Sequence, residues 1–95
     1  MESKKVILRA KNAGVFYGDL IEVVGNQAHL KNVRKLWYWD GAAAVEQIAK
    51  EGVCAPSNCK FTVTVDEMII FDPIQIIHCT DRARASIEAV REWRR

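Results

Sequence analysis

The sequence predicts an α+β fold: a small, strongly bent five-stranded antiparallel sheet with a short inserted helix and a C-terminal helix, in the order βββ-α-ββ-α. Two observations predict it. Three strand-like segments come first, and two more follow an alanine-rich helical segment. A helical stripe of apolar residues then ends the chain. We expect one domain, residues 1–95, because so short a chain cannot bury two separate cores.

The first three strands are predicted to form a meander. Residues 6–11 alternate between two faces, residues 15–24 are rich in β-branched and aromatic side chains, and the third strand covers residues 28–39. Gly18 indicates a bend or bulge inside the second strand. Gly25-Asn26 is typical of a tight hairpin turn, since both residues tolerate a positive φ. These positions favour a sheet that curls.

The register of the third strand decides which way its aromatic residues face. A regular strand sorts its side chains into two faces: Ala28, Leu30, Asn32, Arg34, Leu36 and Tyr38 on one, and His29, Lys31, Val33, Lys35, Trp37 and Trp39 on the other. One bulge near Asn32 would reverse the faces downstream. In both registers Tyr38 is separated from the two tryptophans, so aromatic surface reaches both sides of the sheet.

The inserted helix is predicted over residues 41–50. Asp40 precedes it as a helix N-cap, and Gly52 can end it with a positive φ. After a loop, strands are expected at residues 61–65 and 68–79, separated by a turn at Asp66-Glu67. Pro73 has no N–H to donate, so the last strand should be broken, bulged or at an edge there.

The last helix is predicted to begin after Thr80, a good N-cap. Asp81 in its first turn favours the helix dipole. Ala83, Ile87 and Val90 recur at helical spacing and should form its buried stripe.

Composition bounds the class of protein. The hydrophobic fraction is 49%, as in ordinary globular domains, and no apolar run approaches the length of a membrane span. The first residues lack the apolar region of a secretion signal, so we expect a cytoplasmic protein. Three cysteines are an odd number and do not indicate a disulfide scaffold or a zinc site. The small size favours a homo-oligomer.

The net charge is +2, and the excess of cations lies in the last fifteen residues. Residues 1–80 carry nine cations and nine acids, whereas residues 81–95 carry five arginines and three acids. A nearly neutral body with local positive patches argues against coating long duplex DNA by charge. It suits a small anion or a short single strand.

No catalytic signature is present in the sequence. It contains no Gly-rich phosphate loop, no Gly-x-Ser-x-Gly elbow and no His-x-x-x-His. His29 and His78 would have to meet by folding, and each reads as an ordinary strand residue. We therefore expect no enzyme activity, no catalytic residues, no metal site and no cofactor.

The run Leu36-Trp37-Tyr38-Trp39-Asp40-Gly41 is the strongest functional signal. Aromatic planes beside cations are suited to stacking flat anionic molecules such as nucleotides. Cations could also meet an anion at the start of the last helix, although helical spacing separates Arg82 from Arg84 by about 200° and only one should face a shared site. The predicted ligand-binding residues are therefore Arg34, Lys35, Trp37, Tyr38, Trp39, Arg82 and Arg84.

The second and third strands resemble the first motif of the Sm-like fold. The matching residues are Gly18-Asp19-Leu20, the hairpin, and the run from Ala28 to Val33 with its Asn32. Sm-like proteins are small five-stranded barrels that assemble into rings and bind single-stranded RNA. The resemblance covers about a third of the chain. Neither common second motif, Arg-Gly or Tyr-Lys-His, precedes the last strand, and the helix stands in the middle of the chain.

The run from Leu30 to Ala43 also resembles small bacteriophage-encoded proteins, as do the segments 58–61 and 76–80. Several small phage proteins counter bacterial defence, some by sequestering nucleotide immune signals in stable oligomers. This resemblance implies a non-enzymatic, oligomeric binder of a small nucleotide-type ligand, such as a cyclic nucleotide signal, that acts in the cytoplasm of a bacterial host. The alternatives are an Sm-like protein that binds single-stranded RNA or DNA, and a protein–protein inhibitor of a host factor.

Overall fold

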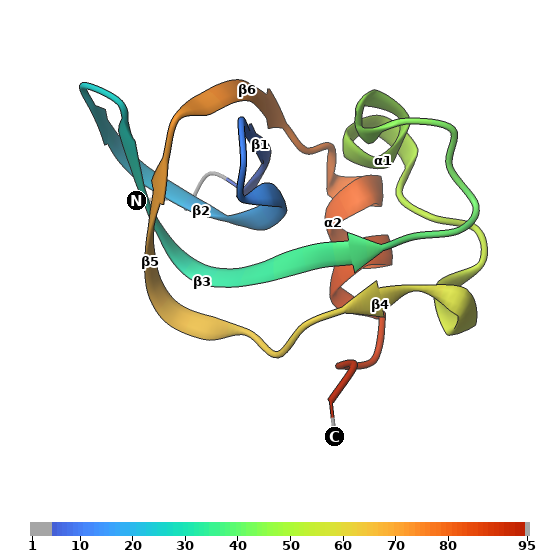
Figure 1. Ribbon diagram of the computed structural model, residues 1–95. Helices are drawn as coiled ribbons and strands as arrows, with labels where there is room; N and C mark the ends of the chain where they lie inside the picture. Colours follow the sequence, from blue (N-terminus) through green and yellow to red (C-terminus); the bar gives the residue numbers. More distant parts are fainter. Residues whose placement is uncertain (1–4, 95) are drawn as a thin grey trace.

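The computed structural model describes residues 5–94 (Figure 1). One sheet contains six antiparallel strands: β1 (Lys5–Ala10), β2 (Gly14–Val24), β3 (Gln27–Tyr38), β4 (Lys60–Phe61), β5 (Val65–Phe71) and β6 (Pro73–His78). The helices are α1 (Val45–Glu51) and α2 (Asp81–Glu88), with a single 3₁₀ turn, η1 (Pro56–Asn58). The α+β prediction is confirmed, with six strands where five were expected.

The strands are ordered β6-β1-β2-β3 across the sheet, and the far side of β3 pairs with β5 along its first half and with β4 at its end. No pairing joins β5 to β6 within the described residues 5–94, so the sheet is open. Asp72, with φ of 57°, links these two strands. Its N–H donates to the carbonyl of Asn26 at 2.8 Å, and its carbonyl accepts from the N–H of Lys11 at 3.0 Å. Through these two hydrogen bonds, Asp72 connects the β1–β2 turn to the β2–β3 turn.

The predicted interruption at Pro73 is confirmed, since the chain turns at Asp72 and Pro73 begins β6 on the edge of the sheet. The predicted turn at Asp66-Glu67 is wrong, because both residues lie inside β5. Glu67 stands directly opposite Lys31 of β3. Opposite charges facing each other across two strands stabilise the pairing, and this partner is invisible in the local sequence.

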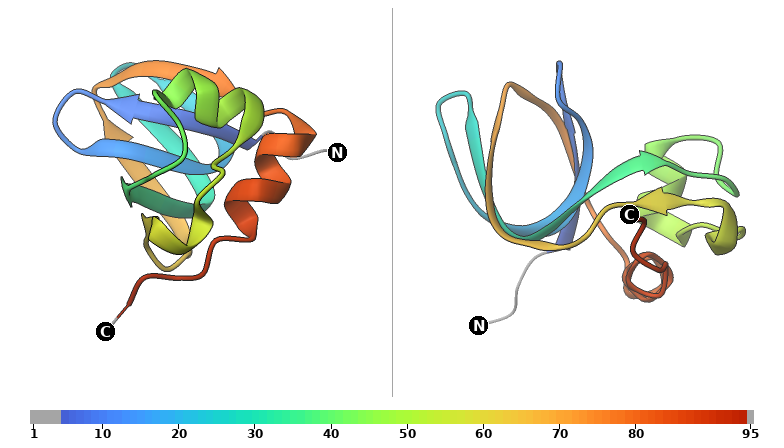
Figure 2. Two further views of the ribbon diagram at one scale, coloured as in Figure 1. Left: turned by 90° about the vertical axis from the view of Figure 1, so that its right-hand side faces the viewer. Right: turned by 60° about the horizontal axis from the view of Figure 1, so that its bottom comes forward.

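The sheet is strongly curled (Figure 2). Two apolar cores lie on its two faces. The inner core gathers side chains from five strands: Val6, Leu8, Ala10, Phe16, Ala28, Leu30, Val33 and Ile70, with Ile76 packed against them. The second core lies between the sheet and both helices, and includes Ile7, Tyr17, Leu36, Ile48, Phe61 and Ile87. Because β1 contributes to both cores, it is buried on both sides.

A bulge at Asn32 sets the faces of β3. Asn32 has φ of 52°, and the pairing of β2 with β3 shifts between Tyr17 and Asp19. Val33 therefore joins Leu30 in the inner core, although a regular strand would place them on opposite faces. Downstream, Arg34 and Leu36 turn toward the helices. The reversal expected from a bulge near Asn32 is confirmed.

The two helices differ in how well the sequence predicted their starts. Thr80 caps α2 as predicted, since its hydroxyl accepts from the N–H of Ala83 at 3.1 Å. Asp40 does not cap α1, which begins at Val45. The Asp40 carboxylate instead accepts from the Asn58 side chain at 3.1 Å, which ties the start of this loop to η1. Gly52 ends α1 with φ of 82°, as expected.

Arg34 fastens α2 to the sheet. Its side chain lies between the end of that helix and β4, and the residue is 5% exposed. The guanidinium donates to four backbone carbonyls, those of Phe61, Thr62, Ile87 and Val90, at 3.0 to 3.3 Å. Burial lowers the pKa of Arg34, and the nearby Glu92 carboxylate opposes that shift. A guanidinium still stays charged in such a place.

Replacing Arg34 should destabilise the protein strongly. Arg34→Met leaves the carbonyls of two separate segments without donors, and we expect a loss of about 2–4 kcal/mol in the free energy of unfolding, measured by urea denaturation. Lys31→Met removes an exposed cation from the same strand together with its cross-strand pair with Glu67, and should change stability by less than about 1 kcal/mol. Equal losses in the two variants would contradict this role for Arg34.

Candidate functional site

An exposed group of two indoles and one ammonium lies at the end of β3 and β4. Trp37 and Trp93 stack with ring centroids 4.9 Å apart and an interplanar angle of 25°. The Lys60 Nζ lies 5.3 Å from the centroid of Trp37 and 5.6 Å from that of Trp93. We call these three residues the aromatic surface. Trp37 is 53% exposed and Trp93 is 38% exposed, so indole area is open to solvent.

The C-terminal segment brings Trp93 to this position. After α2 the chain runs beside β4, where Glu92 forms a parallel bridge with Phe61. The N–H of Trp93 donates to the carbonyl of Phe61 at 2.8 Å. Since Phe61 is fully buried, this backbone contact holds the indole of Trp93 against a fixed part of the sheet.

The three residues of the Trp-Tyr-Trp run have different environments. Trp37 belongs to the aromatic surface, and Tyr38 is 49% exposed opposite Lys60. Trp39 is half-buried and packs against the core under the helices. The run therefore has both exposed and core-packed rings, but the two tryptophans do not share one environment as a regular strand would give them, because β3 ends at Tyr38 and Trp39 lies beyond it.

The predicted cations are not gathered around these rings. Arg34 points into the protein, and the Lys35 ammonium lies 5.9 Å from the centroid of Phe16 in the second strand. Arg82 lines a hollow of about 440 Å³ beside Gly52 and Cys54. Arg84 lines a different hollow, as helical spacing led us to expect of the two arginines. Lys60 is the cation that meets the indoles.

Arg34 and Arg84 meet at a second place, a hollow of about 330 Å³ between the sheet and α2. We call it the polar pocket. Its lining comes from four strands or loops and one helix, and every lining residue has a polar or ionisable side chain: Lys5, Tyr17, Asn32, Arg34, Thr64, Arg84 and Glu88. Arg34 and Arg84, which were predicted as ligand-binding residues from separate parts of the sequence, therefore line the same pocket.

Buried Tyr17 and exposed Glu88 are joined in the polar pocket. The Tyr17 hydroxyl donates to a carboxylate oxygen of Glu88. Burial raises the pKa of Tyr17 well above its ordinary range, and the Glu88 carboxylate raises it further. Nearby, burial raises the pKa of the Cys79 thiol to about 11. Both groups therefore hold their protons at neutral pH.

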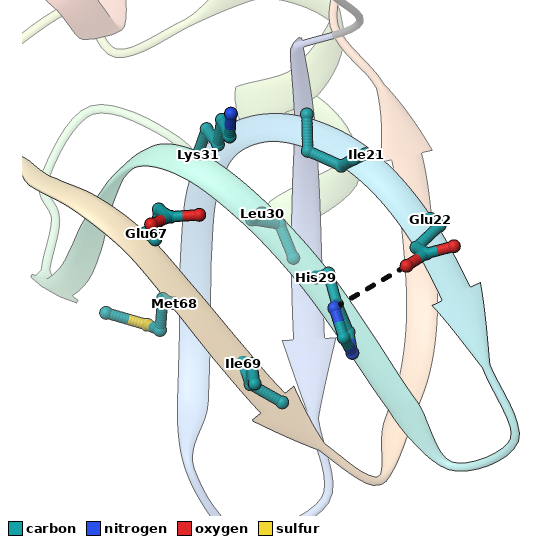
Figure 3. A pocket seen from close by; sticks show the side chains of 8 residues that line it. All are labelled: Ile21, Glu22, His29, Leu30, Lys31, Glu67, Met68 and Ile69. Carbon is teal, nitrogen blue, oxygen red and sulfur yellow. Dashed lines mark ion pairs between the residues drawn. The ribbon is translucent and has the colours of Figure 1, made fainter.

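A shallow groove of about 570 Å³ crosses the outer side of β2, β3 and β5 (Figure 3). Glu22 and His29 face each other across it at 3.7 Å, between Oε2 and Nδ1. Exposed Ile21 and Ile69 stand beside them. None of the described residues forms a cluster of three or more metal-binding side chains, here or elsewhere. No helix among residues 5–94 is long and apolar enough to cross a membrane.

Sequence reasoning missed Lys5, Lys60 and Trp93. Lys60 and Trp93 are 33 residues apart and meet Trp37 only because the C-terminal segment bridges to β4. Lys5 lies near α2 because β1 pairs with β6, the strand that precedes this helix. A lone tryptophan among arginines near the end of the chain was the one local signal available for Trp93.

The chain belongs to a family described as a domain of unknown function, DUF6948, whose profile matches residues 3–87. The match includes Trp37 and Lys60 but stops before Trp93. Comparisons with curated proteins and with solved structures give no match.

The raised pKa of the Tyr17 hydroxyl should make the free energy of unfolding depend on pH in the alkaline range. The folded protein keeps this proton where the unfolded chain releases it near pH 10, so the stabilisation is complete below pH 10 and is lost as pH rises above it. We expect wild-type stability to fall more steeply than that of Tyr17→Phe between about pH 9.5 and 11, measured by urea unfolding. Parallel pH profiles for the two proteins would contradict the assignment.

Proposed function

We propose that the protein is a non-enzymatic, oligomeric binder of a small nucleotide-type ligand, and that the aromatic surface stacks the ligand's base. The observation that carries the proposal is the exposed Trp37–Trp93 stack with the Lys60 ammonium against both rings. A stack of two indoles can be extended by a third flat ring. Each base stacked on an aromatic side chain contributes about 1–3 kcal/mol.

The charge around the aromatic surface supports an anionic partner. Lys60 supplies one ammonium, and Arg94 follows Trp93 directly with a side chain that is 64% exposed. Arg94 is paired with Glu92 at 2.9 Å, but an exposed ion pair is weak and can be exchanged for a phosphate. Of the seven residues predicted from sequence, the proposal keeps Trp37 and the neighbouring Tyr38 in direct contact with the ligand.

An oligomer would complete the site. The aromatic surface is open on one chain, and a nucleotide bound there would remain largely in solvent. The strands also expose apolar side chains that a second copy could cover: Ile21, Val24, Ile69, Phe71 and Ile74, each more than half exposed. The biological role that we propose is sequestration of a cyclic nucleotide signal by a phage protein, and this part of the proposal rests on the resemblance of the tryptophan-rich run.

A second candidate function is binding of single-stranded RNA or DNA on an Sm-like barrel. The strand order β6-β1-β2-β3-β5, together with the direct β5–β6 corner at Asp72, is compatible with a sheet that wraps into a barrel. We propose the barrel as the finer description of the fold. Affinity that grows with strand length and falls steeply with salt would select this function over a small ligand.

The stacking proposal can be tested by titrating nucleotides against the intact protein. Trp37→Ala should weaken the binding of a cyclic dinucleotide about tenfold or more, since loss of a stacked base costs about 1–3 kcal/mol. Trp39→Phe, which changes a ring packed on the core, should leave affinity unchanged. Calorimetry measures both. Absence of binding to every cyclic and linear nucleotide tried, or equal affinity for both variants, would reject the proposal.

The non-enzymatic part has a separate test. The protein is incubated with the bound nucleotide and denatured by heat, and the released ligand is analysed by chromatography. We expect the nucleotide to be recovered unchanged. A product of altered mass would identify an enzyme instead.

A further inference from the structure

We propose that the polar pocket is a binding site for a phosphate-type oxyanion, with Arg84 and Lys5 as its principal ligands. The inference does not rest on the aromatic surface, because the two places share no residue. It rests on three observations. They are the charge of the pocket, the number of donors of each cation that are already hydrogen-bonded, and one buried donor that has no acceptor among the described residues.

The polar pocket brings three cations to one wall, Lys5 from β1, Arg34 from β3 and Arg84 from α2. Within the lining, Glu88 offsets one of these charges, and Asp19, which is 5% exposed and bonds to Lys5 at 3.1 Å, offsets a second. Asp81 near Arg84 and Glu92 near Arg34 lie outside the lining, and solvent screens both because Asp81 is fully exposed and Glu92 is 43% exposed and paired with Arg94. The lining and Asp19 together therefore carry one excess positive charge. A polar hollow with an excess cation in a partly buried place favours an anion over an apolar guest.

The donors of these three cations are not equally available. Arg34 gives four N–H groups to backbone carbonyls, so its charge contributes but its donors are occupied. Lys5 has one recorded acceptor, Asp19, and an ammonium carries three hydrogens. Arg84 has only a long contact with an acid, 3.8 Å to the exposed Asp81. Its guanidinium is the least engaged of the three.

The Nε–H of Arg84 is buried and has no hydrogen-bond acceptor within the described chain. A buried donor without a partner is costly, and native structures supply one from the protein, from water or from a ligand. A guanidinium presents its donors as a fork that fits two oxygens of a phosphate at once. An oxyanion in the polar pocket would satisfy the Nε–H and meet the ammonium of Lys5 at the same time.

Neighbouring side chains limit the size and kind of the anion. Glu88 is engaged by the Tyr17 hydroxyl, and the Oδ2 of Asp19 by both Lys5 and the Asn32 amide at 3.0 Å, while the buried Oδ1 of Asp19 has no donor among the described residues. These bonds moderate the two acids without removing their charge, so a highly charged group such as a triphosphate would be repelled. The volume of about 330 Å³ suits a single phosphate group with a small substituent. Inorganic phosphate and a phosphate monoester share this chemistry.

The test titrates inorganic phosphate, and separately ribose 5-phosphate, into the full-length protein while chloride keeps the ionic strength constant. We expect saturable backbone amide shifts in NMR spectra around Arg84, Lys5 and Asn32. Arg84→Gln should weaken phosphate binding at least tenfold, while Arg84→Lys, which keeps the charge but loses the fork, should fall between this variant and wild type. Stronger binding of ribose 5-phosphate than of phosphate would identify a monoester as the natural ligand class, and the reverse would identify the free ion.

Arg82→Gln is the matched control, because Arg82 lies on the same helix and lines a different hollow. It should bind phosphate as wild type does. Trp37→Ala should also leave phosphate binding intact, so failure of the stacking proposal and failure of this one are distinguishable. Circular dichroism verifies that each variant is folded. Non-saturable shifts, or equal affinity in wild type and folded Arg84→Gln, would overturn the proposal and leave water as the partner of the Nε–H.

Discussion

The buried guanidinium of Arg34 is the contact on which the C-terminal third of the fold depends. It joins the end of α2 to the segment that contains Phe61 and Thr62. An arginine can do this because its five donors diverge in a plane and each can reach a different carbonyl. A lysine offers a point charge and would leave some carbonyls of that junction unpaired.

Both candidate binding places are arranged around this junction. Holding the carbonyl of Val90 fixes where the chain leaves α2, and three residues later Trp93 bonds to Phe61 and stacks on Trp37. On the other side, the same guanidinium forms part of the wall that faces Arg84. Arg34 would therefore act on the proposed ligands by placing other residues, in contrast to the direct phosphate contact that its position beside the aromatic run suggested.

Local sequence patterns predicted the structure correctly where a residue acts on the backbone within a few positions of itself. Thr80 caps α2 through an N–H three residues away, and Pro73 interrupts a strand because it lacks a donor. The same reasoning failed where a partner came from afar. Asp40 has the chemistry of a cap, but its carboxylate accepts a hydrogen bond from Asn58. Asp66 and Glu67 are typical of a turn, but they lie in a strand in which Glu67 pairs with Lys31. Sequence patterns specify periods and turns, whereas side-chain partners depend on which segments fold together.

The same distinction explains why the aromatic part of the site was easier to predict than its cations. Consecutive strand residues point to opposite faces, so Trp37 and Tyr38 at the end of β3 could not both face the core. A cation has no such constraint, because its long side chain can turn inward to carbonyls, as Arg34 does, or lie over a distant ring, as Lys35 lies over Phe16. Whether a cation can meet a ligand depends on the donors that the fold leaves unused. By that criterion Lys60 beside the aromatic surface and Arg84 in the polar pocket have donors available for a ligand.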